Sequence, residues 1–145
     1  MNIDRSVTHL LHRASQAVEG VFATWTGSTN LTPRQLLVLL TVQGQEGLSQ
    51  TDIVERTGID RSTLAHIVRR LKDKGLVRRR RTKEDARAYA VRLTGVGRQV
   101  LGKVSPIAAG VDRSVQGALP SGRHEAFLIA LASIVRTLES GNRAG

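Results

Sequence analysis

Hydrophobic side chains recur at three- and four-residue steps along most of the chain, a period that is typical of amphipathic helices. The period predicts six helices separated by polar or glycine-containing breaks. The first four helices are expected over residues 3–22, from 33 to about 43, and within 49–58 and 60–75. The fifth runs from residue 94 to a break near residues 119–122, and the sixth follows that break with its apolar stripe at residues 127–138.

Residues with a strong preference for helix ends mark the shorter helices. Thr32 and Ser49 each precede an amide or an acid by three residues, which is the spacing of a capping box. Gly58 is expected to end the third helix and Asp60 to begin the fourth, so that a short turn separates the two. Two helices joined in this way form a helix-turn-helix, whose second helix can lie in the major groove of DNA.

A hairpin of two strands is predicted after Gly75, where the period changes to alternation. Four consecutive arginines at positions 78–81 form the first strand, and residues 89–94 alternate between apolar and more polar side chains in the second. A polar loop over residues 82–88 joins the two strands. Because strand side chains point alternately to opposite faces, only two of the four arginines are expected to face a common partner.

The expected fold class is mainly α with a small β-hairpin wing: a winged helix-turn-helix with terminal helices forming a dimerisation region. Residues 31–94 would form the DNA-binding region, and residues 1–30 and 95–140 the helical dimerisation region, within one compact subunit. The terminal helices carry more apolar surface than a small winged unit needs, so we expect the surplus to be buried against a second copy. A monomer whose terminal helices complete the core is the alternative.

Positive charge is concentrated in one part of the chain. The formal net charge is +10, and the segment from Arg61 to Arg92 has 12 basic and 3 acidic side chains, a net charge of +9. Such a concentration indicates a polyanionic partner, although a solvated charged face would have the same composition.

The sequence excludes several other classes of protein. No apolar run approaches the roughly 18 residues of a membrane span, and the first residues lack the apolar stretch of a secretory signal. The absence of cysteine excludes disulfides and thiol-based sensing, and it fits a cytoplasmic protein. The chain has no phosphate-binding glycine loop, paired nucleophile and base, or metal motif, so we expect neither an enzyme nor a cofactor. His9 and His12 have a spacing that a metal could use, but without cysteines and with few acids nearby we interpret them as interface residues.

Several of these segments together resemble the MarR family of bacterial transcription regulators. The resemblance extends over residues 31–101 and is most specific in LKDKGLVRR at the end of the fourth helix. It is also carried by Asp85-Ala86-Arg87 in the wing and by the RLTGVG that begins within the second strand. The family usually has a second arginine at the position of Ala86, so one wing contact is expected to be missing.

The resemblance implies an obligate homodimer that binds a pseudo-palindromic DNA operator, mostly as a repressor. It also implies release of the DNA when a small effector, such as an aromatic acid, binds between the two regions. Arg87 would enter the minor groove, with Asp85 bracing the wing loop. The residues expected in the major groove are Arg61, Ser62, Thr63, Ala65 and His66.

Position along the elements suggests further contacts. The cations expected at the DNA backbone are Arg69, Arg70, Lys72, Arg78 and Arg80. For the effector we expect Arg13 to pair with a carboxylate, and Phe22 and Trp25 to provide an aromatic wall, where the first, second and fifth helices meet. The alternative function is sequence-independent binding of nucleic acid, by an architectural or an RNA-binding protein, because charge alone would serve it.

Overall fold

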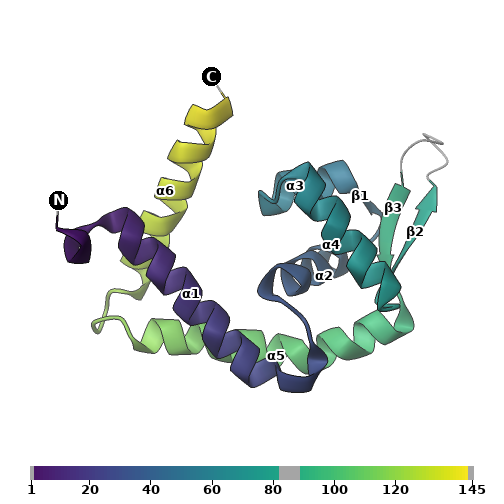
Figure 1. Ribbon diagram of the computed structural model, residues 1–145, viewed down its shortest axis with the longest axis horizontal. Coiled ribbons are helices and arrows are strands. Elements are labelled where there is room, and N and C mark those ends of the chain that lie inside the picture. Colours follow the sequence, from purple (N-terminus) through teal and green to yellow (C-terminus); the bar gives the residue numbers. More distant parts are fainter. Residues whose placement is uncertain (1, 82–88, 144–145) are drawn as a thin grey trace. The chain divides into compact units, whose positions relative to one another are not determined.

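The computed structural model describes residues 2–81 and 89–143, and there it contains the six expected helices and the hairpin (Figure 1). Short additional elements are the 3-10 helices η1 and η2 and the strand β1. The elements are η1 (Ile3–Arg5), α1 (Val7–Thr26), η2 (Gly27–Thr29), α2 (Pro33–Gly44), β1 (Leu48–Ser49), α3 (Gln50–Thr57), α4 (Arg61–Asp73), β2 (Val77–Arg81), β3 (Tyr89–Leu93), α5 (Gly95–Gly117) and α6 (His124–Arg143). None of the described helices combines the length and apolar character that a membrane crossing needs.

Two predicted boundaries were wrong. The first helix begins at Val7 rather than at residue 3, because the Ser6 side chain accepts a hydrogen bond from the His9 amide and so caps α1. The same helix continues past residue 22 and ends at Thr26, before Gly27. The strand β1 was not predicted, since two residues directly before a helix show no alternation.

The helix caps agree with the sequence. Thr32 and Gln35 form a capping box at the start of α2, and Ser49 and Asp52 form one at the start of α3. Gly58 ends α3 in the left-handed conformation, with φ of 70°. These local signals therefore fix where the two helices of the helix-turn-helix begin and how close together they lie.

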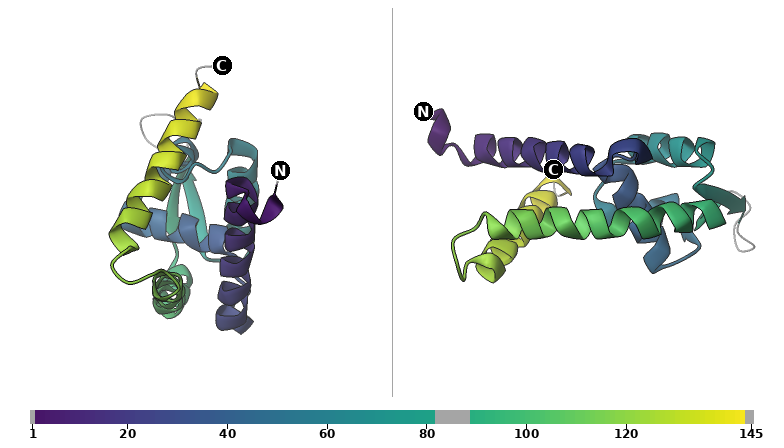
Figure 2. Two further views of the ribbon diagram at one scale, coloured as in Figure 1. Left: turned by 90° about the vertical axis from the view of Figure 1, so that its left-hand side faces the viewer. Right: turned by 90° about the horizontal axis from the view of Figure 1, so that it is seen from below.

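The three strands form an antiparallel sheet in the order β1-β3-β2, with β3 in the centre. Leu48 pairs with Val91 and Arg79 pairs with the same residue from the other side. Ala90 was expected on the more exposed face but is buried. In Figure 1 the far ends of β2 and β3 extend away from α4 and from the start of α5, which agrees with the exposure of the arginines of β2. The first unit is seen from two further sides in Figure 2.

Contacts divide the chain into two compact units, Met1–Ala109 and Gly110–Gly145. The core of the first unit is made of the apolar faces of α2, α3, α4, the sheet and the first half of α5. Its fully buried side chains include Leu39, Ile53, Leu64, Leu71, Leu93 and Leu101. The predicted stripe of α4 is confirmed, because Leu64, Ile67, Val68 and Leu71 are all buried.

The second unit contains the end of α5, a turn and α6. The turn at residues 118–123 falls where the sequence LPSG predicted a break, and Gly122 there has φ of 74°. In α6, all of which the structure describes, no residue is buried. Its apolar side chains include Leu128 and Leu138, which are 47% and 65% exposed within this single chain. The helix α5 continues through Pro106.

Candidate nucleic-acid interface

The helix α4 presents a polar face opposite its buried stripe. Of the residues predicted for the major groove, Arg61, Ser62 and His66 are exposed, and Thr63 and Ala65 are partly exposed. The structure therefore places the five on the accessible part of the helix. The cations Arg69, Arg70 and Lys72, predicted to contact phosphates, are exposed farther along α4.

Asp60 organises the first turn of α4. Its carboxylate accepts hydrogen bonds from the Thr63 amide at 2.9 Å, from the Thr63 hydroxyl at 2.6 Å and from the Ser62 hydroxyl at 3.0 Å. The bonds from the Thr63 hydroxyl and amide, followed by that from Ser62, lower the pKa of Asp60 to about 2. The start of α4 thus already holds a negative charge, which opposes a phosphate there.

The same network decides how Ser62 and Thr63 could read a base. A hydroxyl group has one proton to donate and two lone pairs that accept. Both protons are directed to Asp60, so both oxygens present acceptors to an incoming base edge. The groups that such oxygens suit are the amino groups of cytosine and adenine.

Two further side chains of α4 are held by neighbours. Arg61 donates from Nη1 to the hydroxyl of Thr51 on α3 at 3.1 Å, which ties the two helices of the motif together. Arg70 donates from Nε to Nε2 of His66 at 3.1 Å. Because Nε2 is the acceptor, the proton of His66 lies on Nδ1, where it can donate to a base acceptor.

The arginines of the wing divide between the two faces of β2, as the alternation predicted. Arg79 and Arg81 lie on the face of Tyr89, with their guanidinium carbons 5.9 and 5.8 Å from its ring centroid. Arg81 also donates to the Tyr89 hydroxyl at 3.3 Å, and this bond lowers the pKa of Tyr89. This cluster was not predicted from the sequence, although the register of a hairpin would bring Tyr89 opposite Arg81.

Arg78 and Arg80 point to the other face of β2. Arg78 is directly paired with Arg92 of β3, so two like charges lie opposite each other. Such a pair is unfavourable by itself and is relieved by an anion. This face is therefore the better candidate for phosphate contact, and contact of Arg78 and Arg80 with phosphates stays a prediction.

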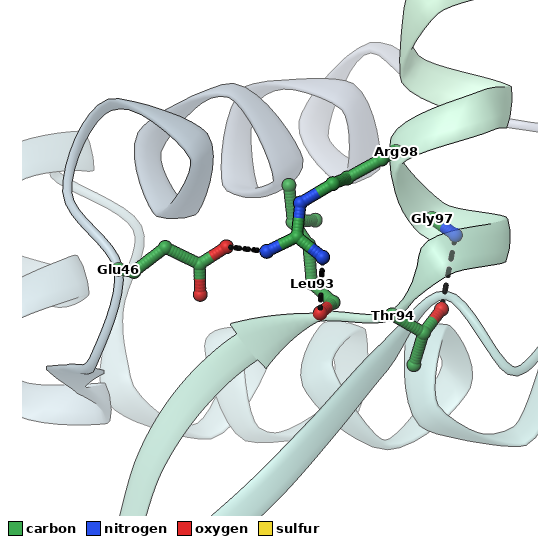
Figure 3. A network of polar contacts seen from close by, with 5 residues as sticks. All are labelled: Glu46, Leu93, Thr94, Gly97 and Arg98. Carbon is green, nitrogen blue, oxygen red and sulfur yellow. Dashed lines mark hydrogen bonds and ion pairs between the residues drawn. The ribbon is translucent and has the colours of Figure 1, made fainter.

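Polar contacts fix the base of the wing to α5 and to the loop that contains Glu46 (Figure 3). Arg98 of α5 forms an ion pair with Glu46 at 2.7 Å and donates to the backbone carbonyl of Leu93 at 3.3 Å. The Thr94 hydroxyl accepts a hydrogen bond from the Gly97 amide at 2.9 Å and donates to the Gly75 carbonyl. The ion pair of Arg98 was not predicted, because Glu46 lies in a loop 52 residues away along the chain.

The wing tip is outside the described part of the chain. The predicted minor-groove residue Arg87 and the predicted brace Asp85 both lie in residues 82–88, outside the described residues.

A cavity of about 480 Å³ lies between the end of α1 and the start of α2. Phe22 is among the residues that line it, whereas Arg13 and Trp25 are not, so the effector contacts expected for Arg13 and Trp25 stay predictions. The charged side chains at the cavity are Glu19 and Arg34 instead. Glu19 and Phe22 belong to a series at helical spacing on one face of α1, and Arg13 and Trp25 fall outside that series.

Within residues 2–81 and 89–143, no three of the histidine and acidic side chains gather where a metal could bind. His9 and His12 are thus not part of such a group among the described residues. The charged groups that the structure does gather are cations on α4 and β2.

A helix-turn-helix with an accessible second helix, next to a basic hairpin anchored at its base, defines a winged helix-turn-helix DNA-binding protein. A sequence model of the MarR family matches residues 29–88. The chain is 30% identical to the transcriptional regulator HosA of Escherichia coli O111:H-, over 81% of this chain and 87% of HosA. It therefore belongs to the MarR family and is a DNA-binding transcription regulator.

Solved structures agree with this assignment. Bordetella bronchiseptica BpsR, whose DNA binding is regulated by 6-hydroxynicotinic acid, superimposes with a TM-score of 0.87 at 29% identity, covering 93% of this chain and 96% of BpsR. The transcriptional repressor CouR, bound to a 23-mer DNA duplex, superimposes with a TM-score of 0.83 at 28% identity, covering 91% of this chain and 94% of CouR.

Proposed function

We propose that this protein is a homodimeric, effector-responsive repressor that binds a pseudo-palindromic operator in the cytoplasm and has no enzymatic activity. The observation that carries the proposal is that two kinds of side chain occupy separate parts of the first unit. Hydrogen-bonding side chains occupy the first turns of α4, whereas cations occupy its later turns and the wing. Base readout needs the former and affinity for phosphate needs the latter.

Each side chain has a role that follows from its contacts. Ser62 and Thr63 accept hydrogen bonds from base amino groups, and His66 donates from Nδ1. Arg61 and Ala65 complete the surface in the major groove. The phosphate contacts are Arg69, Arg70, Lys72, Arg78 and Arg80. Arg87 enters the minor groove with Asp85 bracing its loop, by analogy with the family.

The proposed dimer uses residues 1–30 and 95–140, and residues 31–94 bind the DNA. Its support is apolar surface that a single chain leaves exposed on both terminal helices. Val7 of α1 is 64% exposed and Val135 of α6 is 52% exposed. Burial of apolar surface contributes roughly 25 cal/mol per Å², so a second copy that covers these helices would stabilise both chains.

The effector proposed for the cavity is a small aromatic acid. The volume of the cavity, about 480 Å³, lies within the range of about 300–1,000 Å³ that small-molecule sites occupy. Phe22 offers an aromatic wall, Arg34 a partner for a carboxylate, and Glu19 an acceptor for a hydroxyl or ring N–H. The compound that regulates DNA binding by BpsR, 6-hydroxynicotinic acid, has an aromatic ring, a carboxylate and a hydroxyl group. It is therefore the first compound to test.

The test of the proposed function is selection of binding sites from random DNA duplexes at about 150 mM salt, where nonspecific binding is weak. We expect a pseudo-palindromic consensus with half-site centres about 10 base pairs apart. The selected duplex should bind on the order of 10³ times more tightly than a scrambled one. His66→Ala should reduce this ratio, whereas Arg69→Ala should weaken binding to both duplexes alike. Enrichment without a consensus would favour sequence-independent binding.

A further inference from the structure

The C-terminal end of α4 is tied to the wall of the cavity by one side chain, Lys74. Its ammonium group donates to the backbone carbonyl of Asn30 at 2.5 Å and to the amide oxygen of Gln35 at 3.3 Å. Asn30 itself lines the cavity. Lys74 is the residue that caps the C-terminus of α4, so it belongs to the recognition helix rather than to the cavity.

The acceptors of Lys74 lie in the turn before α2 and in the first turn of α2, and hydrogen bonds link these two segments. Asn30 adopts the left-handed conformation, with φ of 51°, and is the only non-glycine residue to do so in the described chain. The Gln35 side chain is 5% exposed, and its amide oxygen also accepts from the Thr32 amide at 3.2 Å as part of the capping box. Thr32 lines the cavity too. The turn between α1 and α2 therefore has few ways to move without disturbing Lys74.

We propose that Lys74 couples the cavity to the recognition helix, so that an occupant of the cavity moves the Asn30–Thr32 turn and thereby displaces the end of α4. This inference rests on the proposed function, because it assigns the route by which the effector of that cavity lowers DNA affinity. Lys74 is a positioning residue, since it acts through the turn and not on a base. All of its contacts lie within the first compact unit.

The physical argument is that both ends of α4 are held by polar contacts of different kinds. The N-terminal end is fixed by Asp60 and by the Arg61 bond to Thr51, neither of which touches the cavity. The C-terminal end is fixed through Lys74 to a turn that does touch it. A change in the cavity thus acts on one end only and tilts the helix, which misaligns the side chains that read bases.

The experiment occupies the cavity without an identified ligand. Ala23 lines the cavity, so Ala23→Phe places a ring in it. DNA affinity is measured for Ala23→Phe in the otherwise unchanged protein and in backgrounds with Lys74→Met, Lys74→Arg or Lys72→Met. Lys72→Met is the matched control, because it removes the same charge two residues earlier. Its own loss of a phosphate contact lowers DNA affinity with and without Ala23→Phe, so that loss cancels in the ratio between the two.

We expect Ala23→Phe to weaken DNA binding about tenfold, within the usual range of coupling between sites. The loss should fall below about twofold in the Lys74→Met background and stay near tenfold with Lys72→Met. Arginine keeps the donors, so Lys74→Arg should restore the coupling. An equal loss in all backgrounds, or no loss from Ala23→Phe alone, would overturn the proposal.

A second measurement covers variants that fold poorly and separates this inference from the proposed function. Hydrogen exchange of residues 29–36 is followed in the free protein and with saturating duplex DNA of about two helical turns at low salt, where any sequence binds. DNA should slow this exchange severalfold in the unchanged protein and in Lys72→Met, but not in Lys74→Met. Retention of the slowing in Lys74→Met would refute the coupling even if a specific operator is found. Failure to select an operator would refute the proposed function and leave this measurement valid.

Discussion

Gly97 is the position where a single methyl group should disturb the protein most sharply. A Cβ atom built on Gly97 would lie 2.0 Å from the carbonyl oxygen of Leu76 and 2.9 Å from its carbonyl carbon. Ordinary contact begins at 3.4 Å, so the backbone of α5 or of Leu76 would have to move by more than 1 Å. Gly97→Ala is therefore expected to separate the start of α5 from the segment that joins α4 to the wing.

The magnitude follows from the contacts that such a shift would strain. The Leu76 carbonyl accepts from the Thr94 amide at 3.0 Å, and the Gly97 amide donates to the Thr94 hydroxyl at 2.9 Å. Overpacking in a well-packed region costs about 1–3 kcal/mol, and each lost hydrogen bond costs about 1 kcal/mol. Gly97→Ala should thus lower the free energy of unfolding by about 3–5 kcal/mol if both hydrogen bonds are lost.

A matched control variant, Gly102→Ala, should change the free energy of unfolding in the opposite direction. Gly102 lies in the same helix, and a Cβ there would meet nothing within 4 Å. Replacing glycine by alanine inside a helix normally stabilises it by up to about 1 kcal/mol, so Gly102→Ala should raise the free energy of unfolding. The stability of both variants is measured by urea unfolding followed by circular dichroism. Both are measured at the same protomer concentration, because this protein is proposed to be a dimer. If Gly97→Ala proves as stable as Gly102→Ala, the close approach to Leu76 does not exist.

Three further predictions concern the ends of α4 and the wing. The pKa of Asp60 lies at about 2, below its ordinary value of 3.8, so its carboxylate contributes stability that is complete above about pH 4 and is lost as the pH falls through 2. Asp60→Asn should therefore flatten the dependence of the unfolding free energy on pH between about 4 and 2, and an unchanged slope in urea titrations would contradict the network. Arg98→Lys keeps the charge but loses the planar fork that reaches both Glu46 and the Leu93 carbonyl. The Arg98 side chain is 55% exposed and that of Glu46 28% exposed, so we expect the ion pair to contribute at most about 1 kcal/mol. DNA affinity should then fall by no more than about fivefold, and a much larger loss in binding assays would mean that Arg98 touches DNA. Arg78→Ala should reduce the slope of log affinity against log salt by about 0.9, the value for one phosphate contact. Arg79→Ala, on the Tyr89 face, should change that slope less, and the reverse order would place the other face of β2 on the DNA.

The parts of the fold that could be predicted from sequence are those fixed by local signals. Side chains such as Thr32, Ser49 and Asp60 cap helices through neighbours two or three residues away, so their sequence spacing already contains the geometry. The buried stripe of α4 follows from the helical period alone. The division of the arginines between two faces of β2 likewise follows from strand alternation.

The remaining features depend on contacts between distant parts of the chain. The strand β1 forms because Leu48 and Ser49 pair with β3, and two residues are too few to show a pattern that would predict it. Arg98 and Lys74 looked like ordinary surface cations, and their partners were determined only by the packing of α5 and α4. The cavity is an instructive intermediate case. The helical spacing of Glu19, Phe22, Ala23 and Thr26 could have predicted the wall that α1 contributes. The contribution of Arg34 could not be predicted, because it depends on how α2 packs beside α1.

Repulsion between the arginine side chains of the wing destabilises the free protein, and bound DNA should relieve this repulsion. Four consecutive arginines are exposed on β2, and Arg78 faces Arg92 across the strand pair, so like charges repel within the wing. The fold tolerates this repulsion because the base of the wing is fixed by Arg98, Thr94 and the close approach at Gly97. Phosphates that neutralise the arginines should therefore stabilise the wing as well as bind it. At a free DNA concentration 100 times the dissociation constant, linkage alone adds about 2.7 kcal/mol to the stability of the folded state. Because the affinity of this contact falls steeply with salt, the gain in melting temperature on adding DNA should shrink as salt rises, and it should shrink less in Arg78→Ala.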